Sequence, residues 1–289
     1  MTSKVSVHGG HSGEFCGHAT DTLEQIVKRY IELGFEWVCL TEHMPLDHDC
    51  LLPQADFVAG LDSSAIQKRF TRYFAEARRL QKHYSDSIEI FVGFETEVFD
   101  GYEPILSKLI ECHKPDMLVG SVHHVNNIMI DGSEEDFKSA ILRSGGIENL
   151  YCDYFDQQLA LINSFEPEVI GHFDLIRLHD PDYKHRWDVP EIKNRALRNL
   201  ARIKELGLIL DLNLRAMSKG NDEPYISKPF LRFAVNEGIS IMPGDDSHGV
   251  DGVAANWEQG ITALAESGGN MHWSKPKDFR PPFGKNGSR

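Results

Sequence analysis

The sequence predicts an α/β fold in which seven parallel strands form a closed or nearly closed barrel. Short apolar runs recur along the chain with helix-like segments between them, which is typical of parallel sheets with crossover helices. Most of these runs are continuous rather than alternating, as expected for strands buried on both faces. The chain lacks a G-x-G-x-x-G turn, which argues against a doubly wound dinucleotide-binding sheet.

The predicted strands cover residues 5–7, 37–40, 88–92, 117–119, 169–170, 208–212 and 239–242. A helix is predicted over 23–31, where apolar residues recur at helical spacing, with Asp21 and Glu24 as a capping box and Gly34 as a stop. A longer apolar stripe predicts a second helix over 66–80.

Two more helices are predicted in the second half of the chain. Asp188, with Pro190 and Glu191 after it, opens a helix that runs to Gly207. Residues 227–229 open another, which ends near residue 238. The long connection over 44–62 is expected to be a lid or substrate loop.

The composition predicts a cytoplasmic protein that forms a single domain over residues 1–289, with a loose tail from about 276 to 289. The net charge of −14 argues against nucleic acid and anionic membranes as partners. The five cysteines include no C-x-x-C pair and are expected to be reduced thiols. The chain has no apolar leader and no apolar run of membrane-spanning length. We make no prediction of oligomeric state.

Histidines gather where the predicted strands end. Eight of the fourteen follow a strand directly or lie in the loop after it, together with acidic residues. Functional groups of parallel α/β barrels come from this edge. Imidazoles and carboxylates that converge in a site of low dielectric constant each need a partner, and divalent metal ions supply one. Because the donors outnumber those of one four-coordinate ion, we expect two to three ions of zinc, manganese or iron.

These strand-end segments also carry a resemblance to a known family. HSGEFCGH, LTEHMP, GFETE, GSVHH, GHFDLIR, LDLN and GDDSH occur in this order from His11 to His248. In order and spacing they resemble the PHP (polymerase and histidinol phosphatase) family, and within it the histidinol-phosphate phosphatases, fungal members especially.

The resemblance implies a distorted (β/α)₇ TIM-like barrel with a trinuclear metal site, in which Glu95 is the bridging carboxylate. By position, the implied ligands are His11, His18, His43, Glu95, His123, His172, Asp246 and His248. It also implies a metal-dependent phosphomonoesterase of histidine biosynthesis. Such an enzyme hydrolyses the small phosphate ester L-histidinol phosphate to L-histidinol and phosphate by attack of a hydroxide held between the ions.

The first strand departs from the family pattern. The family's strand ends in H-x-H, but here Gly9 stands two residues before His11 and the nearest histidine is His8. A bulge at Gly9 and Gly10 would bring His8 onto the metal, since glycine tolerates the backbone angles required. The alternatives are a site with one ligand fewer, completed by water, and a metal-poor protein of weak activity.

Further roles are expected of residues near these ligands. Asp246 or His248 is the candidate proton donor to the leaving alkoxide. Arg177 and Arg215 follow strand ends and are candidates to bind the phosphate. Glu42 is one of several carboxylates suited to the substrate amine. Cys16 lies between two candidate ligands and is expected to be a packed thiol.

Other functions compete with this hypothesis. A phosphoesterase acting on another small phosphate would use the same fold and metals, and a nuclease would too, although the acidic composition counts against it. A catalytically impaired, metal- or phosphate-binding regulator is supported by Gly9 alone. A metal-dependent amidohydrolase usually carries a lysine at a strand end, and none of these seven ends has one.

Overall fold

The computed structural model of the protein describes residues 3–52, 56, 58 and 60–276. Over these residues, seven parallel strands form one sheet in the order β1-β2-β3-β4-β7-β8-β9. Each strand overlaps a run predicted from the sequence, so the seven-stranded α/β barrel is confirmed. The strands are β1 (Lys4–Gly9), β2 (Phe35–Leu40), β3 (Glu89–Glu95), β4 (Met117–Gly120), β7 (Val169–Ile170), β8 (Ile209–Asn213) and β9 (Ser240–Gly244).

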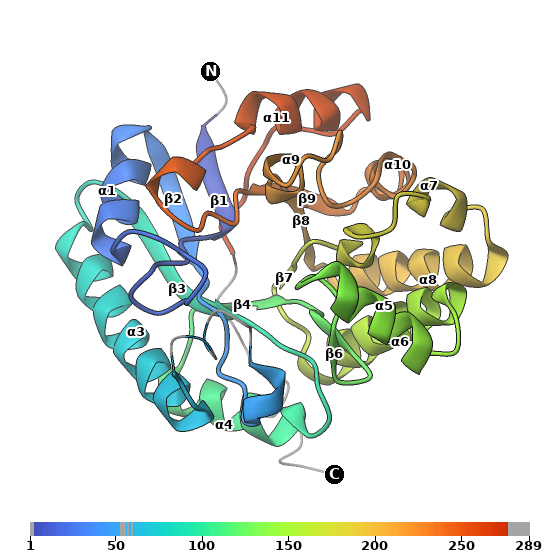
Figure 1. Ribbon diagram of the computed structural model, residues 1–289. Coiled ribbons are helices and arrows are strands. Elements are labelled where there is room, and N and C mark those ends of the chain that lie inside the picture. Colours follow the sequence, from blue (N-terminus) through green and yellow to red (C-terminus); the bar gives the residue numbers. More distant parts are fainter. Residues whose placement is uncertain (1–2, 53–55, 57, 59, 277–289) are drawn as a thin grey trace, which may run out of the picture.

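Helices surround the strands and connect consecutive ones (Figure 1). The longer helices are α1 (Leu23–Glu32), α3 (Ser63–His83), α4 (Tyr102–His113), α5 (Glu134–Arg143), α6 (Ile147–Phe165), α8 (Pro190–Leu206), α10 (Lys228–Asn236) and α11 (Trp257–Glu266). Shorter elements lie in the loops: η1 (Asp49–Leu51), the hairpin of β5 (His124–Val125) and β6 (Ile128–Met129), η2 (Leu175–Arg177), α7 (Tyr183–Arg186), α9 (Arg215–Ser218) and η3 (Val250–Gly252).

The two ends of the sheet, β1 and β9, meet and nearly close the barrel. The backbone N–H of Asp246 donates to the carbonyl of His8 at 2.8 Å. The Ser6 hydroxyl donates to Asp245 Oδ1 at 3.0 Å. These bonds lie at the carboxyl ends of both strands, so they also fix the position of the loops that follow.

Apolar side chains pack on both faces of the sheet, which is why its strands read as continuous apolar runs. The larger cluster lies between the strands and the surrounding helices. A smaller cluster takes side chains from the opposite strand faces and includes Val5, Val7, Trp37, Cys39, Met117, Val119, Val169, Ile209 and Met242. The carboxyl-end layer of the same inner face is polar, and the candidate site is formed there.

Some predicted boundaries are corrected. The capping box of α1 is formed by Thr22 and Gln25, one residue later than expected. Asp21 instead accepts a hydrogen bond from the backbone N–H of Val250 at 2.8 Å. The helix expected from Asp188 begins at Pro190. The expected tail lies almost wholly outside the described residues, as does part of the loop over 44–62, and the single-domain assignment stays a prediction.

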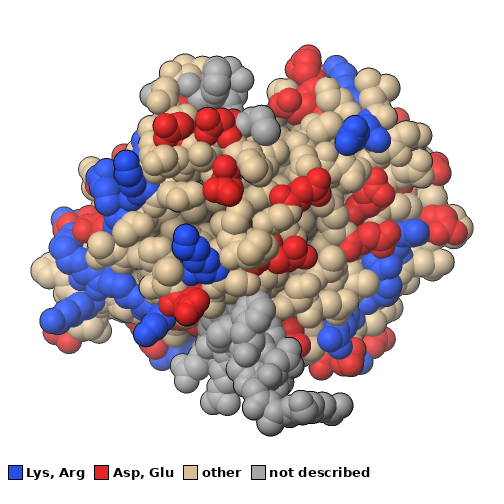
Figure 2. Space-filling model, turned by 90° about the horizontal axis from the view of Figure 1, so that it is seen from below, with Lys and Arg blue, Asp and Glu red and all other residues tan. Residues whose placement is uncertain are grey.

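The surface mixes charges of both signs. On the face seen in Figure 2, Asp and Glu side chains are spread across the molecule, and Lys and Arg gather mainly toward its edges. Within the described residues, no helix combines the length and the apolar character needed to cross a membrane.

Candidate metal centre

The end of β1 contains an irregularity that sets the position of His8. Three steps along β1, from Ser6 to Gly9, are paired with two steps along β2, and Gly10 adopts a positive φ of 80°. A bulge of this kind resets the alternation of side chains. Val7 therefore packs in the inner apolar cluster, and the next residue, His8, also faces the barrel interior.

His8 is held between carboxylates. Its Nδ1 lies 2.8 Å from Asp211 Oδ2. Its Nε2 lies 3.4 Å from Glu95 Oε2 and 4.0 Å from Asp246 Oδ1. A Cβ atom on Gly9 would instead collide with the Tyr30 hydroxyl and with Asp245. The sequence leaves three alternatives for the departure from H-x-H at Gly9. Among them, the geometry favours the bulge that brings His8 into the centre.

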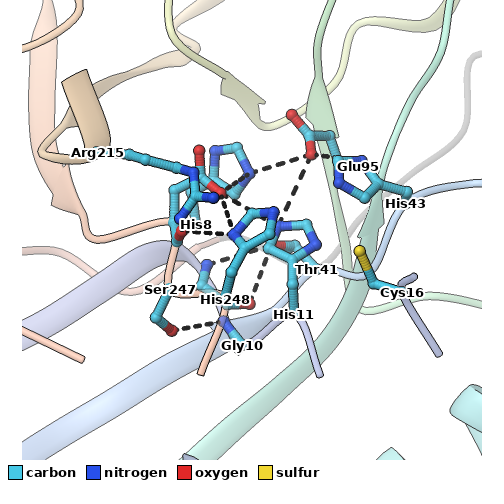
Figure 3. Close-up of polar contacts among 12 residues, drawn as sticks. His8, Gly10, His11, Cys16, Thr41, His43, Glu95, Arg215, Ser247 and His248 are labelled. Carbon is cyan, nitrogen blue, oxygen red and sulfur yellow. Dashed lines mark hydrogen bonds and ion pairs between the residues drawn. The ribbon is translucent and has the colours of Figure 1, made fainter. Parts of the chain in front are cut away.

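His11 completes a first group of donors. Its Nε2 lies 3.3 Å from Asp246 Oδ1 and 3.8 Å from Glu95 Oε2. Its Nδ1 lies 3.4 Å from Glu42 Oε1. Donor atoms of His8, His11 and Asp246 thus converge, and Glu95 lies beside both histidines (Figure 3).

Glu95, at the end of β3, connects this group to a second. Its Oε1 lies 2.7 Å from His172 Nε2 and 3.2 Å from His123 Nε2. Its Oε2 lies 3.0 Å from His43 Nδ1. The two carboxylate oxygens therefore face imidazoles carried by different strand ends, which is the geometry of a bridging ligand.

A third group lies at the mouth of the centre. Donor atoms of His18, His43, His248 and Cys16 all lie within 4.8 Å of one another. The ring centroid of His18 is 5.0 Å from that of His248 and 5.3 Å from that of His43. The structure thus brings together all nine metal ligands expected from the sequence.

The charges of the centre are strongly coupled. Burial alone would lower the pKa of His8, but the carboxylates of Glu95 and Asp246 outweigh it and raise that pKa well above its ordinary value. The pKa values of His43 and His123 are raised in the same way by nearby carboxylates, against the effect of burial. Protons on these rings thus supply positive charge that a metal ion would otherwise supply.

The third group behaves differently. Burial lowers the pKa of His18 to about 3, helped by the neighbouring charges of His43 and His11. Burial also takes the pKa of His248 well below its ordinary value. Both rings are therefore neutral at pH 7, with lone pairs free to bind a cation.

The donor set fits divalent metal ions. Within the described part of the chain, Nε2 of His8, Nε2 of His11 and Oδ1 of Asp246 are buried without a hydrogen-bond partner. Buried polar atoms are rarely left so, and several of these converge. A cation at that point would satisfy all three, and nitrogen and oxygen donors suit the borderline metals.

Two acidic residues of the centre were not expected as members of it. Glu97 Oε1 lies 2.9 Å from His123 Nδ1, and Asp211 binds His8. Glu97 lies two residues after Glu95, in the segment that directly follows β3, and this place after a strand end is a signal available in the sequence. Asp211 stands in the LDLN segment at the end of β8, where its carboxylate orients a ligand.

The candidate substrate residues have different positions. Arg215, at the start of α9, lines the cavity over the centre. Arg177 does not: it is 1% exposed and donates to Asn221 Oδ1 and the Pro224 carbonyl, both at 2.8 Å. This position does not favour the phosphate role predicted for Arg177, because its guanidinium connects loops by hydrogen bonds. Glu42 contacts His11 and accepts from the N–H of Ser12 at 3.3 Å, which favours orienting His11 over binding an amine.

The centre forms the floor of a cavity of about 750 Å³. Its walls include apolar side chains from the loops after β1 and β2, among them Phe15 and Leu46. Acidic residues of the segment after β6 line it too, namely Asp131, Glu135 and Asp136. A cavity of this size suits a small molecule, and its carboxylates favour one with a cationic group.

Fold and site together define a metal-binding α/β barrel protein whose donors lie at the carboxyl ends of its strands. Residues 9–215 match the model of the PHP domain family. The chain belongs to the PHP domain family, as the resemblance of its motifs predicts.

Individual proteins similar to this chain are consistent with this family assignment. A protein of Schizosaccharomyces pombe named "Probable histidinol-phosphatase" is 36% identical over 273 residues, covering 91% of this chain and 87% of the relative. The histidinol-phosphatase of Saccharomyces cerevisiae is 27% identical, covering 87% and 85%. A solved structure of histidinol phosphate phosphatase from Lactococcus lactis, in complex with zinc, L-histidinol and phosphate, superposes with a TM-score of 0.70. It is 22% identical, covers 94% of this chain and 99% of its own, and supports the fold.

Proposed function

We propose that the protein is a metal-dependent phosphatase that hydrolyses L-histidinol phosphate to L-histidinol and phosphate. The observation that carries this proposal is the convergence of buried, unpaired imidazole and carboxylate donors on the floor of a small-molecule cavity with acidic walls. Histidinol phosphate combines a phosphate with a cationic amine. The named activity of the relatives supports the same substrate.

The centre is proposed to hold three divalent ions of zinc, manganese or iron. The first would take His8, His11, Glu95 and Asp246, and the second Glu95, His123 and His172. The third would take His18, His43 and His248. Such ions supply Lewis acidity toward phosphoryl oxygens and water, and they reverse the local negative potential.

Residues of the protein are proposed to transfer the proton and to bind the phosphate. Asp246 is ionised, since His8 and His11 hold its pKa well below the ordinary range against the effect of burial. Its carboxylate is proposed to accept the proton of the attacking water and to return it to the leaving alkoxide oxygen. His248, which is neutral, is the alternative proton carrier. The Arg215 guanidinium, with Nη1 3.3 Å from the Asp246 carbonyl, is proposed to bind the phosphate.

The test is phosphate release from L-histidinol phosphate and from a generic aryl phosphate, with bound metals counted before and after zinc, manganese or iron is added back. We expect selective release with three ions per chain. Asp246→Asn should lose about two orders of magnitude or more in kcat, the range for a general base. Little release at full metal occupancy would redirect the search to another small phosphate. Little release with fewer than two ions would identify an impaired centre.

A further inference from the structure

Cys16 lies within the third donor group, although the sequence suggests a packed thiol. It is 5% exposed, and its Sγ lies 3.3 Å from Nδ1 of His18. In Figure 3 its sulfur atom points toward His43. One donor atom from each of Cys16, His18, His43 and His248 falls within 4.8 Å of the other three.

The loop backbone holds the thiol in this position. A tight turn follows β1, in which the N–H of Phe15 and that of Cys16 both donate to the Ser12 carbonyl, at 3.0 and 2.8 Å. Phe15 anchors the turn by packing against Tyr73 of α3, with ring centroids 5.8 Å apart. The turn and the packing of Phe15 thus fix the position of the sulfur independently of its hydrogen bond to His18.

The distance between Cys16 Sγ and His18 Nδ1 matches that expected of two ligands of one metal ion. Zinc binds thiolate sulfur at about 2.3 Å and imidazole nitrogen at about 2.0–2.1 Å, so tetrahedral angles place the two donors about 3.6 Å apart. The separation of Cys16 Sγ from His18 Nδ1 is close to this value. A plain S–H···N hydrogen bond would also fit that single distance, but it would not require two further imidazoles around the same point.

We propose that Cys16 is a fourth protein ligand of the third ion, giving that position a donor set of three imidazoles and one thiolate. A thiolate selects zinc or cobalt over manganese, whereas the other two positions offer nitrogen and oxygen alone. The third position then differs from its neighbours in metal preference. The inference rests on the proposed metal-dependent function, but its test is spectroscopic and does not use turnover.

The experiment strips the whole protein of metal and titrates it with Co²⁺ while near-ultraviolet absorption is recorded. A sulfur-to-cobalt charge-transfer band should grow to saturation with one of the bound equivalents. Cys16→Ser should lose the band and bind one equivalent roughly tenfold or more weakly, since loss of even an outer-shell partner costs about 10–100-fold in affinity. Cys112→Ser, at an exposed cysteine of α4, should keep the band.

Each outcome is decisive. Three bound cobalt ions without a thiolate band in the unaltered protein would overturn the role of Cys16 and leave the phosphatase proposal standing. A band that survives in Cys16→Ser would assign the thiolate elsewhere. No cobalt binding at all would count against the proposed function itself. Because the first readout uses the unaltered chain, a folding defect in the variant does not remove the test.

Discussion

At the residue scale, Gly9 and His8 show how a candidate ligand reaches the centre although its spacing from His11 differs from the family's H-x-H. The residue at position 9 approaches the Tyr30 hydroxyl and Asp245 so closely that a side chain there has no room. Tyr30 itself donates to Asp245 at 2.7 Å, so neither neighbour is free to move away. The extra residue of the bulge instead presents His8 to Glu95 and Asp246.

This geometry predicts the result of exchanging the two residues. The double variant His8→Gly, Gly9→His restores H-x-H in the sequence, but its imidazole would be directed at Tyr30 and Asp245. We expect it to lose one bound ion per chain and roughly 100-fold in phosphate release, as does His8→Ala. Elemental analysis and the phosphate assay measure both. Full metal content and activity in the double variant would show that the bulge does not select His8.

Arg215 gives a second prediction at this scale. Its guanidinium lines the cavity, and a charge-assisted bond to phosphate contributes about 1.5–3 kcal/mol. Arg215→Ala should therefore raise KM for histidinol phosphate about 10–100-fold while the unfolding temperature stays the same. Lys219→Ala, on the same cavity wall, is the matched control and should change KM less. An unchanged KM in Arg215→Ala would leave the phosphate without its proposed protein ligand.

At the element scale, Arg177 joins η2 to the segment that precedes α10. Its guanidinium lies over the rings of Tyr183 and Tyr225, at 4.9 and 4.8 Å from their centroids. Tyr225 lines the cavity, so the arginine supports the wall without being one of its lining residues. Asp174 assists by accepting hydrogen bonds from the backbone N–H groups of Ile226 and Ser227.

Replacing Arg177 should therefore lower the free energy of unfolding rather than weaken substrate binding directly. Arg177→Ala leaves the buried Asp174 carboxylate without its cation, and breaking such a pair costs about 3–5 kcal/mol. The expected result is a clear drop in unfolding temperature with metal content retained, measured by thermal denaturation. Arg177→Lys should recover part of the loss. A variant of normal stability with a KM raised as in Arg215→Ala would restore the phosphate role expected from the sequence.

These elements also show what the sequence could predict. Continuous apolar runs bounded by polar turns identify all seven strands, because burial on both faces leaves a local signal. The sequence analysis predicts no helix over 147–165, although the buried residues of α6 share one helical face. The nine candidate metal ligands follow from strand ends and motif order. The direction of Arg177 and the bond between Asp211 and His8 depend on contacts between distant segments, which no local pattern encodes.

At the scale of the whole molecule, the charge distribution favours a cation at the centre. The chain carries 44 acidic and 30 basic residues, yet the proposed substrate bears a phosphate. The carboxylates of Glu95, Glu97, Asp211 and Asp246 are among those buried at the carboxyl end of the barrel. Without metal, protons on neighbouring histidines balance part of this charge, so metal content and pH should act on stability together.

We therefore expect metal removal to lower the unfolding temperature, and the loss to grow as pH rises. Each tightly bound ion adds about 4 kcal/mol when free metal exceeds its Kd about 1,000-fold. In the metal-free protein, the raised pKa values of His8, His43 and His123 contribute stability that is complete below the unfolded pKa of about 6.5 and is lost as pH rises through the folded pKa. Metal-loaded protein has already released these protons, so its curve should change little. Thermal denaturation from about pH 6 to 9, with and without chelator, measures the difference. As a control, the exposed-histidine variant His83→Gln should show the same difference between the two curves as the unaltered protein. Parallel curves with and without chelator would exclude proton–metal exchange at the centre.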